Sequence, residues 1–588
     1  MKKSLSNNEN FSLAAENYKK KNFGAAESIC RKILNIDSKH FDSIWLMGLL
    51  AVRTKKFHEA KKFFLRAIEI KPNSEKAYNN LGNACKELGE FSEATDFYKK
   101  SINIQPNNAN AHYNLGNTNQ LLQKYDEALI SYEQAIKIKP DYFHAYYSSG
   151  NIHHKIGNFE DAKNFYEKTI QIMSQHAGAH NNLGLIFSKL GKSSQAIACY
   201  AKAIEIKSDY TSAYVNLGLA YTELGQFIKA IDCYKNAIKQ EPQNLNNYYY
   251  LINLQKEKLD LNLKNRIEII LKEKKTTQLN YAYGNFLLAK YKNKEKNYKE
   301  ELDYLIKAHS YYIESNKSLK KEIKYWLNDL PDIKNLIDKI KSKGKNKNHE
   351  LSPIFIVGVP RCGSTLIEKI ITSGKKFVPC GEETTVLSTF FKEIKLHEKS
   401  TLNFDELEKF KEKIFQRYEK KNLVQKNSDY IFTDKSLENF FYLGLIKEMY
   451  PKAKIINCQR NILSSIMSIF QNNLTGLAWT HDLENIFKYF NNYFNQIKYY
   501  NEKIPNFIYN LNFEKFINNS VIESKKLMEF CELPWDKKCL EYYKRKDLVS
   551  KTTSNIQIRK AIFKGVSDKY KPYKNLLKKY SNKYSWFN

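Results

Sequence analysis

The fold of the C-terminal half is decided by residues 353–371, which read PIFIVGVPRCGSTLIEKII. Residues 354–357 are four consecutive apolar side chains, as in a central parallel strand that is covered on both faces. Residues 358–365 then predict a short loop, and residues 366–371 predict the first turns of a helix. Such a turn aims backbone N–H groups and a helix N-terminus at one point, which favours phosphate binding.

This loop differs from a P-loop, GxxxxGK[ST], in one residue that matters for chemistry. Gly358 and Gly363 keep the spacing of the two glycines, but Ser364 stands where the lysine would be. An NTPase needs that lysine on the β- and γ-phosphates, so we expect a nucleotide site without triphosphate hydrolysis. Arg361 supplies a fork that suits an oxyanion, and Ser364 and Thr365 add hydroxyl donors.

Residues 7–244 carry seven copies of a repeat whose period is 34 residues. Glycine and alanine recur where two helices would approach too closely for a larger side chain. An aromatic residue is expected to fill the gap at the next helix, and proline follows a helix that it cannot continue. The series are Gly48, Gly82, Gly116, Gly150, Gly184 and Gly218; Ala26, Ala60, Ala94, Ala128, Ala162, Ala196 and Ala230; Phe23, Phe57, Phe91, Tyr125, Phe159 and Phe227; and Pro72, Pro106, Pro140 and Pro242.

This pattern resembles the tetratricopeptide repeat and implies an α-solenoid in the N-terminal half. Such solenoids present a concave groove to peptides or proteins, so we expect an acceptor or partner protein to dock there. The alternative is that the array only stiffens the protein or pairs two copies as a homodimer, because a fold does not settle its ligand. Residues 245–349 predict a helical connector that ends in the basic linker KSKGKNKNH at 341–349, and residues 350–588 form the remaining domain.

Two motifs of that last domain resemble the sulfotransferase family. PRCGSTL at 360–366 corresponds to the family's 5′-phosphosulfate loop, PRSGTTL, and Arg460 precedes Ser468 by eight residues, as in the family's 3′-phosphate signature. CGEET at 380–384, FTDKS at 432–436 and LPWD at 533–536 bring the resemblance closer to tyrosylprotein sulfotransferases. The resemblance implies a P-loop-like α/β domain with a central parallel sheet, 3′-phosphoadenosine 5′-phosphosulfate as the donor, and no metal.

The family also implies roles for individual residues. Lys435 and Arg361 would stabilise charge on the donor, with help from Ser554. The general base would be a glutamate of CGEET; counting from the loop arginine points to Glu382 and aligning the letters points to Glu383, so both remain candidates. The donor would be bound by Pro360, Arg361, Cys362, Gly363, Ser364, Thr365, Arg460, Ser468 and Lys569.

The sequence departs from the family pattern at a few positions. Cys362 replaces a serine; its N–H can still donate to the donor, but a thiol invites oxidation. Phe513 stands where many relatives have tyrosine, which removes a phenol near the adenine. His481 is expected to be a partly exposed structural histidine rather than an acceptor-site residue.

Composition excludes several classes of protein. A hydrophobic content of 42% is too high for a disordered chain. The net charge of +32 could indicate an anionic partner, but the lysines are dispersed and no RNP, KH or zinc-finger pattern occurs, so we expect no nucleic acid. The N-terminal residues contain no apolar signal core, no run of about 18 apolar residues predicts a membrane span, and the nine cysteines form no CxxC pair, all of which indicates the cytoplasm.

The leading hypothesis is therefore a sulfotransferase that modifies a hydroxyl, with protein tyrosine as the acceptor suggested by the closest motifs. The alternatives are a repeat-linked glycosyltransferase and a non-catalytic repeat scaffold. The intact loop and the Arg460–Ser468 pair argue against both.

Overall fold

The computed structural model describes residues 7–255, 259–316, 318–331, 333, 351–399, 401–424, 430–545, 557–562 and 569–587. The chain divides into two compact units, Met1–Ala213 and Tyr214–Asn588. The basic linker predicted at 341–349 lies outside the described residues, and the domain boundaries predicted at 244 and 349 remain predictions.

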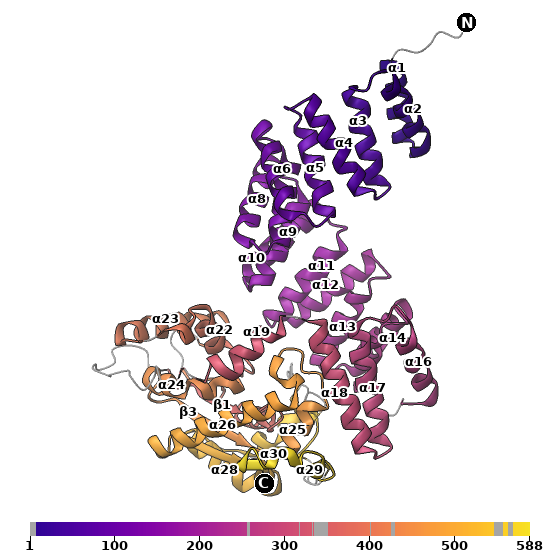
Figure 1. Cartoon of the computed structure of the whole chain (residues 1–588). Helices are drawn as coiled ribbons and strands as arrows, with labels where there is room; N and C mark the ends of the chain where they lie inside the picture. Colours follow the sequence, from indigo (N-terminus) through magenta and orange to yellow (C-terminus); the bar gives the residue numbers. More distant parts are fainter. Residues whose placement is uncertain are drawn as a thin grey trace. The chain divides into compact units, whose positions relative to one another are not determined.

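The first unit is an α-solenoid of packed helix pairs that follow the 34-residue repeat (Figure 1). A residue of the predicted aromatic series opens the second helix of most pairs, and each predicted proline lies two residues beyond the end of such a helix. The pairs are α1 (Asn7–Lys19) and α2 (Phe23–Ile36), α3 (Phe41–Arg53) and α4 (Phe57–Ile70), α5 (Glu75–Glu87) and α6 (Phe91–Ile104), α7 (Ala109–Leu121) and α8 (Tyr125–Ile138), α9 (Phe143–Ile156) and α10 (Phe159–Ile172), and α11 (Ala177–Lys189) and α12 (Ser193–Ile206). A seventh pair, α13 (Thr211–Glu223) and α14 (Phe227–Gln240), begins at the boundary between the units.

The glycine and alanine positions are close approaches between helices, as predicted. Every alanine of the series is fully buried, and a Cβ added to Gly82 would lie 2.7 Å from Cε1 of Tyr98. The aromatic partner, however, is not the predicted one. Phe91 opens α6 and is only half-buried, whereas the ring against each glycine belongs to a residue sixteen positions later, as in the pairs Gly48–Phe64, Gly116–Tyr132, Gly150–Tyr166, Gly184–Tyr200 and Gly218–Tyr234.

The second unit contains a central parallel sheet. Its described strands lie in the order β2 (Thr433–Asp434), β1 (Ile354–Gly358), β3 (Lys454–Gln459) and β4 (Ile508–Asn512), all parallel. All five residues of β1 are buried, as the apolar run predicted. Because the carboxyl ends of parallel strands meet at one edge, the residues that follow β1, β2 and β3 lie close together.

Helices surround this sheet. They are α21 (Ser364–Ile371), α22 (Val386–Glu393), α23 (Phe404–Lys420), α24 (Leu443–Met449), α25 (Ile462–Phe470), α26 (Leu483–Lys503), α27 (Phe513–Asn518), α28 (Ser520–Phe530), α29 (Tyr573–Leu576) and α30 (Lys578–Ser581). Short 3-10 turns lie at η3 (Leu396–Glu398), η4 (Leu437–Tyr442), η5 (Ala478–His481), η6 (Lys537–Lys544), η7 (Gln557–Arg559) and η8 (Ser585–Phe587).

The connector shares one hydrophobic core with the sheet domain. It consists of α15 (Leu245–Leu254), α16 (Leu261–Lys272), α17 (Gln278–Lys294), α18 (Tyr298–Ser315), α19 (Leu319–Lys324) and the π-helical turn η2 (Tyr325–Asp329).

A pair of buried histidines joins the connector to the sheet domain. Nδ1 of His309 lies 2.9 Å from Nδ1 of His481, and Nε2 of His309 lies 2.8 Å from the carbonyl oxygen of Phe470. Burial lowers the pKa of His309 to about 3 and the pKa of His481 to about 4. His481 is only 2% exposed, so the expectation that it would be partly exposed is wrong; the packing of the connector over η5 covers it.

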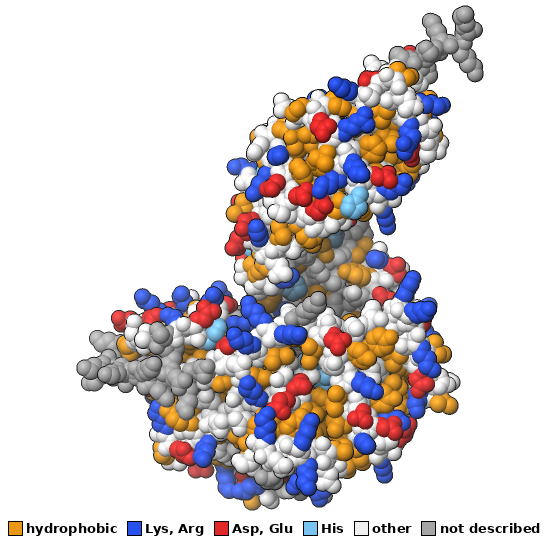
Figure 2. Space-filling view, in the orientation of Figure 1, with side chains coloured by type: hydrophobic (Ala, Val, Ile, Leu, Met, Phe, Trp, Pro, Cys, Tyr) orange, Lys and Arg blue, Asp and Glu red, His pale blue; other side chains and the backbone are white. Residues whose placement is uncertain are grey.

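The surface agrees with a dispersed positive charge. On the face that Figure 2 shows, Lys and Arg side chains are scattered among acidic and apolar ones rather than gathered in a stripe. All nine cysteines are free thiols. Over the part of the chain that the structure describes, no helix combines the length and apolar character needed to cross a membrane.

Candidate donor and transfer site

The loop between β1 and α21 has the backbone that its glycines suggest. Arg361 and Gly363 adopt φ angles of 70° and 97°, in the left-handed region. A Cβ at Gly363 would lie 2.2 Å from Cδ2 of Phe513, and a Cβ at Gly358 would lie 2.8 Å from the carbonyl oxygen of Cys458. Glycine is therefore required at both positions by close approach as well as by backbone conformation.

The two predicted phosphate-binding clusters lie in one site. Nε of Arg361 donates to Oγ of Ser468 at 2.9 Å, and Nη1 of Arg460 donates to the carbonyl oxygen of Arg361 at 3.1 Å. Burial lowers the pKa of Arg361, and the neighbouring Arg460 lowers it further, while Tyr570 opposes them. The Arg460 guanidinium lies 5.5 Å from the ring centroid of Phe513. Two arginines held this close suit a ligand with more than one negative group.

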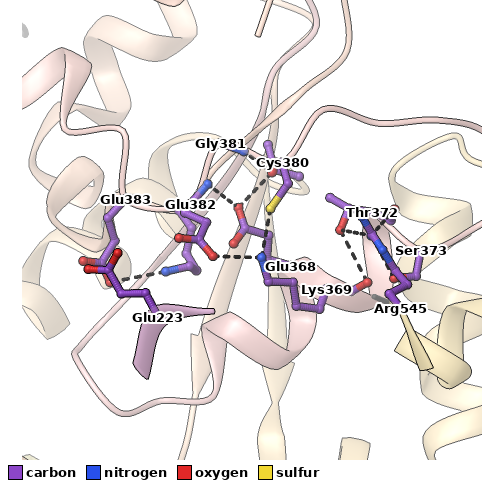
Figure 3. Close-up of polar contacts among 12 residues, drawn as sticks. Glu223, Glu368, Lys369, Thr372, Ser373, Cys380, Gly381, Glu382, Glu383 and Arg545 are labelled. Carbon is purple, nitrogen blue, oxygen red and sulfur yellow. Dashed lines mark hydrogen bonds and ion pairs between the residues drawn. The ribbon is translucent and has the colours of Figure 1, made fainter. Parts of the chain in front are cut away.

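The structure separates the two candidate glutamates (Figure 3). Glu382 points toward Lys369, whose Nζ lies 2.8 Å from its Oε1, and its side chain is 17% exposed. Glu383 lies on the side of Glu382 that faces away from Lys369. Its side chain is 54% exposed, and its Oε1 accepts from Nζ of Lys435 at 3.3 Å. Burial would lower the pKa of Lys435, but the carboxylates of Glu383, Glu368 and Glu382 outweigh it and raise that pKa. Lys435 is therefore a buried cation directed at Glu383.

Glu368 holds the loop that carries both glutamates. This residue of α21 is fully buried, and its Oε1 accepts from the Glu382 N–H at 2.9 Å and from the Thr433 hydroxyl at 2.8 Å. The Lys435 N–H donates to the Glu382 carbonyl at 2.7 Å. Glu382 itself has a φ of 51°, a left-handed conformation that costs about 1–2 kcal/mol and needs such restraint. Nothing in the sequence pointed to Glu368, because its role depends on contacts between three separate segments.

A cluster of metal-ligand types beside this loop is already occupied by a lysine. Ligand atoms of Glu368, Cys380 and Glu382 lie within 4.8 Å of one another. Nζ of Lys369 lies 3.3 Å from the Cys380 sulfur and 2.8 Å from Glu382. The ammonium group therefore already supplies a cation to these residues.

Cys362 lies beneath the loop. It is fully buried, and its N–H donates to the Val359 carbonyl at 3.2 Å; its part in binding the donor stays a prediction. A hydrogen bond with Cys458 lowers the pKa of the Cys362 thiol to about 7, against the effect of burial.

The remaining predicted residues fall into three groups. Pro360, Ser364 and Thr365 line the pocket described below. Lys569 is exposed, and its described contact is with the neighbouring Tyr570, whose hydroxyl is 3.5 Å from Nζ; no described contact joins Lys569 to the loop. Ser554 lies outside the described residues.

A pocket of about 550 Å³ opens over the loop and Glu383. One side is formed by the loop residues Pro360, Arg361, Gly363, Ser364 and Thr365. The other side is formed by residues that sequence analysis missed, and no motif marks them. They come from η2, α22, η4 and residues 473–489, and include Tyr325, Trp326, Ser388, Lys392, Glu438, Leu477, Trp479 and Tyr489.

The comparison with known families agrees with this geometry. Residues 353–537 match the model of the sulfotransferase family. This part of the chain is a sulfotransferase family domain. Models of the tetratricopeptide repeat match residues 41–74, 63–96, 82–123, 109–142, 143–175, 185–225 and 211–244. The chain therefore combines tetratricopeptide repeats with a sulfotransferase domain.

Individual relatives are more distant. The chain is 30% identical over 331 residues to an uncharacterized protein of Aquifex aeolicus (strain VF5). The match covers 53% of this chain and 42% of that protein, so the chain spans less than half of its relative's length. Among solved structures, MamA is 28% identical, with 28% of this chain and 95% of MamA covered and a TM-score of 0.27. YrrB, described as a TPR protein with an unusual peptide-binding site, is 22% identical, with 33% and 97% covered and a TM-score of 0.29.

Proposed function

We propose that the sulfotransferase domain moves a sulfuryl group from 3′-phosphoadenosine 5′-phosphosulfate to a hydroxyl acceptor, with a protein tyrosine as that acceptor. The contact of Arg361 with both Ser468 and Arg460 carries the proposal. It joins the 5′-phosphate loop to the residues that the family uses for the 3′-phosphate, as a donor with both phosphates on one ribose requires.

Glu383 is the better candidate for the general base. It lines the pocket, whereas Glu382 is held by Lys369 and the Glu368 tether. Glu383 would take the proton of the acceptor hydroxyl, whose oxygen forms a bond to sulfur while the bond from sulfur to the 5′-phosphate oxygen breaks. Lys435 would donate a hydrogen bond to that leaving oxygen, so the products are a sulfate ester and adenosine 3′,5′-bisphosphate.

The tetratricopeptide repeats would dock the acceptor or a partner protein, since solenoid grooves bind peptides. The cytoplasm as location and a homodimer as assembly remain predictions from the sequence.

The first test is ligand binding. Adenosine 3′,5′-bisphosphate should raise the melting temperature of the full chain, UDP should not, and Arg361→Ala should remove the shift. Arg417→Ala is the matched control, since this arginine pairs with Glu393 on α22 and does not line the pocket. The second test is transfer of ³⁵S from labelled donor to tyrosine peptides. Stabilisation by UDP alone, or full transfer by Arg361→Ala, would defeat the proposal.

A further inference from the structure

The pocket extends past the donor loop and the base to a second wall. We name as the distal wall the residues Trp326 of η2, Ser388 and Lys392 of α22, and Glu438 of η4, all of which line the pocket. Trp326 lies in the π-helical turn, where the Leu330 N–H reaches the Tyr325 carbonyl at 2.9 Å. Such turns occur frequently at functional sites. The distal wall thus combines an aromatic ring, a hydroxyl, an ammonium and a carboxyl group.

Glu438 is the unusual member of the distal wall. Burial, with the nearby carboxylates of Asp434 and Glu383, raises its pKa to about 7, although hydrogen bonds to its carboxylate from the backbone and from Ser388 act in the opposite direction. The Ser388 hydroxyl donates to its Oε1 at 2.8 Å. A carboxylate can accept several hydrogen bonds, so the serine uses only part of its capacity. No step of the proposed transfer uses this group.

Charged groups of both signs line the pocket: the carboxylates of Glu383 and Glu438, Arg361 in the donor loop, and Lys392 on the distal wall. Glu383 and Glu438 both line the pocket and interact electrostatically with one another, while Lys392 is exposed and lies 5.2 Å from the centroid of the Tyr325 ring. A third carboxylate brought between two others meets like charge in a partly desolvated space, which disfavours binding. A hydroxyl or ammonium group in the same place gains a charge-assisted hydrogen bond.

We propose that the distal wall binds the acceptor peptide beside its reacting tyrosine and that Glu438 selects a basic or neutral neighbouring side chain over an acidic one. This inference rests on the proposed function. It goes further by assigning a specificity residue and the charge of the acceptor sequence.

The test uses three peptides that differ only in the residue next to a single tyrosine, which is Lys, Gln or Glu. Transfer of ³⁵S is measured at pH 8, where Glu438 is ionised. We expect kcat/KM to be at least about tenfold higher for the Lys peptide than for the Glu peptide, with Gln between them. Glu438→Gln should reduce this ratio to within about twofold, because it keeps the shape and removes the charge.

Two variants control for general effects. Lys392→Gln removes the opposite charge from the distal wall and should widen the ratio. Glu393→Gln removes a carboxylate from the same helix outside the pocket and should leave the ratio at its wild-type value.

The outcomes separate the two proposals. A ratio that is unchanged in Glu438→Gln, or a preference for the Glu peptide in the wild-type protein, would overturn the role of Glu438. If adenosine 3′,5′-bisphosphate binds but none of the three peptides is labelled, the donor site stands and the acceptor assignment is wrong. If the bisphosphate does not bind, the proposed function fails first.

Discussion

Replacing Glu368 with alanine should disable transfer without disabling donor binding. The variant removes the acceptor of the Glu382 N–H and of the Thr433 hydroxyl, which are 2.9 and 2.8 Å away. The Thr433 hydroxyl keeps only a longer contact with the Pro379 carbonyl, at 3.4 Å. A donor left without its partner costs about 1–3 kcal/mol. It also frees Glu382, whose φ is 51°, to leave the left-handed region. A loss of about 2 kcal/mol that acts on this loop alone lowers the equilibrium constant for holding Glu383 in place by about 30-fold.

The assay compares kcat for sulfuryl transfer with the Kd for adenosine 3′,5′-bisphosphate. We expect kcat of Glu368→Ala to fall by up to about 30-fold while Kd changes by less than about threefold. Glu368→Gln keeps the accepting oxygen and should retain most of kcat.

Glu301→Ala is the matched control for lost stability, because Glu301 is also buried and accepts from Asn293, Gln471 and Tyr573, but lies outside the pocket. Wild-type kcat in a folded Glu368→Ala variant would refute the positioning role. Equal losses of kcat and of donor binding would show that Glu368 only stabilises the fold and does not position Glu383.

Three further predictions follow from single positions. In a denaturant titration, Gly116→Ala should lower the free energy of unfolding of the repeats by about 1–3 kcal/mol, since its Cβ would lie 2.5 Å from a tyrosine ring. Gly24→Ala is the control: its Cβ would meet nothing within 4 Å, so this variant should be neutral or slightly stabilising. The buried histidine pair should make the protein less stable as pH falls, because the pKa of His481 is about 4 in the folded state against 6.5 in the unfolded state. The free energy of unfolding should be highest above about pH 6.5 and should fall as pH falls toward 4, by on the order of 2 kcal/mol at pH 5. In His481→Asn the urea midpoint should therefore drop less between pH 7 and pH 5 than it does in the wild-type protein. Glu383→Gln should lower kcat by at least about a hundredfold and Glu382→Gln by less than about tenfold, with the opposite order showing that the base is Glu382.

The sequence predicted what depends on local pattern. The 34-residue register predicted the helix pairs, and the apolar run at 354–357 predicted the buried strand β1. It also indicated two phosphate-binding clusters, because glycine spacing and an arginine after a strand are visible in the letters alone. It could not distinguish Glu382 from Glu383, since the difference lies in a positive φ and in contacts with Lys369 and Lys435.

The far side of the pocket was not predictable for a related reason. Trp326, Ser388 and Glu438 come from segments that are distant in sequence and carry no motif. Ser388 and Glu438 meet within the sheet domain, and the packing of the connector against that domain adds Trp326. The aromatic ring opposite each repeat glycine was missed because a close approach is visible as a small residue, while the identity of the opposing ring depends on how the two helices are rotated.

One repeat differs from the others in what its turn glycine contacts. The residue just before the second helix's N-cap adopts a positive φ in every repeat, and the position is held by lysine or glutamine in some repeats and by glycine in others: Lys21, Lys55, Gly89, Gln123, Gly157, Gly191 and Gly225. The turn thus tolerates a side chain at the cost of backbone strain, and a Cβ at Gly89, Gly157 or Gly191 would meet nothing within 4 Å. At Gly225 a Cβ would lie 2.0 Å from Nε of Arg559.

That arginine comes from the C-terminal part of the same unit. Its Nη2 donates to the Glu223 carbonyl at 3.1 Å, and its guanidinium lies 6.0 Å from the centroid of the Phe227 ring. Its charge also acts on Glu382, in the loop beside the base. The turn glycine of the seventh repeat is therefore needed for packing as well as for its positive φ, because the absence of a side chain at 225 leaves room for a guanidinium that binds the end of α13 and interacts electrostatically with Glu382.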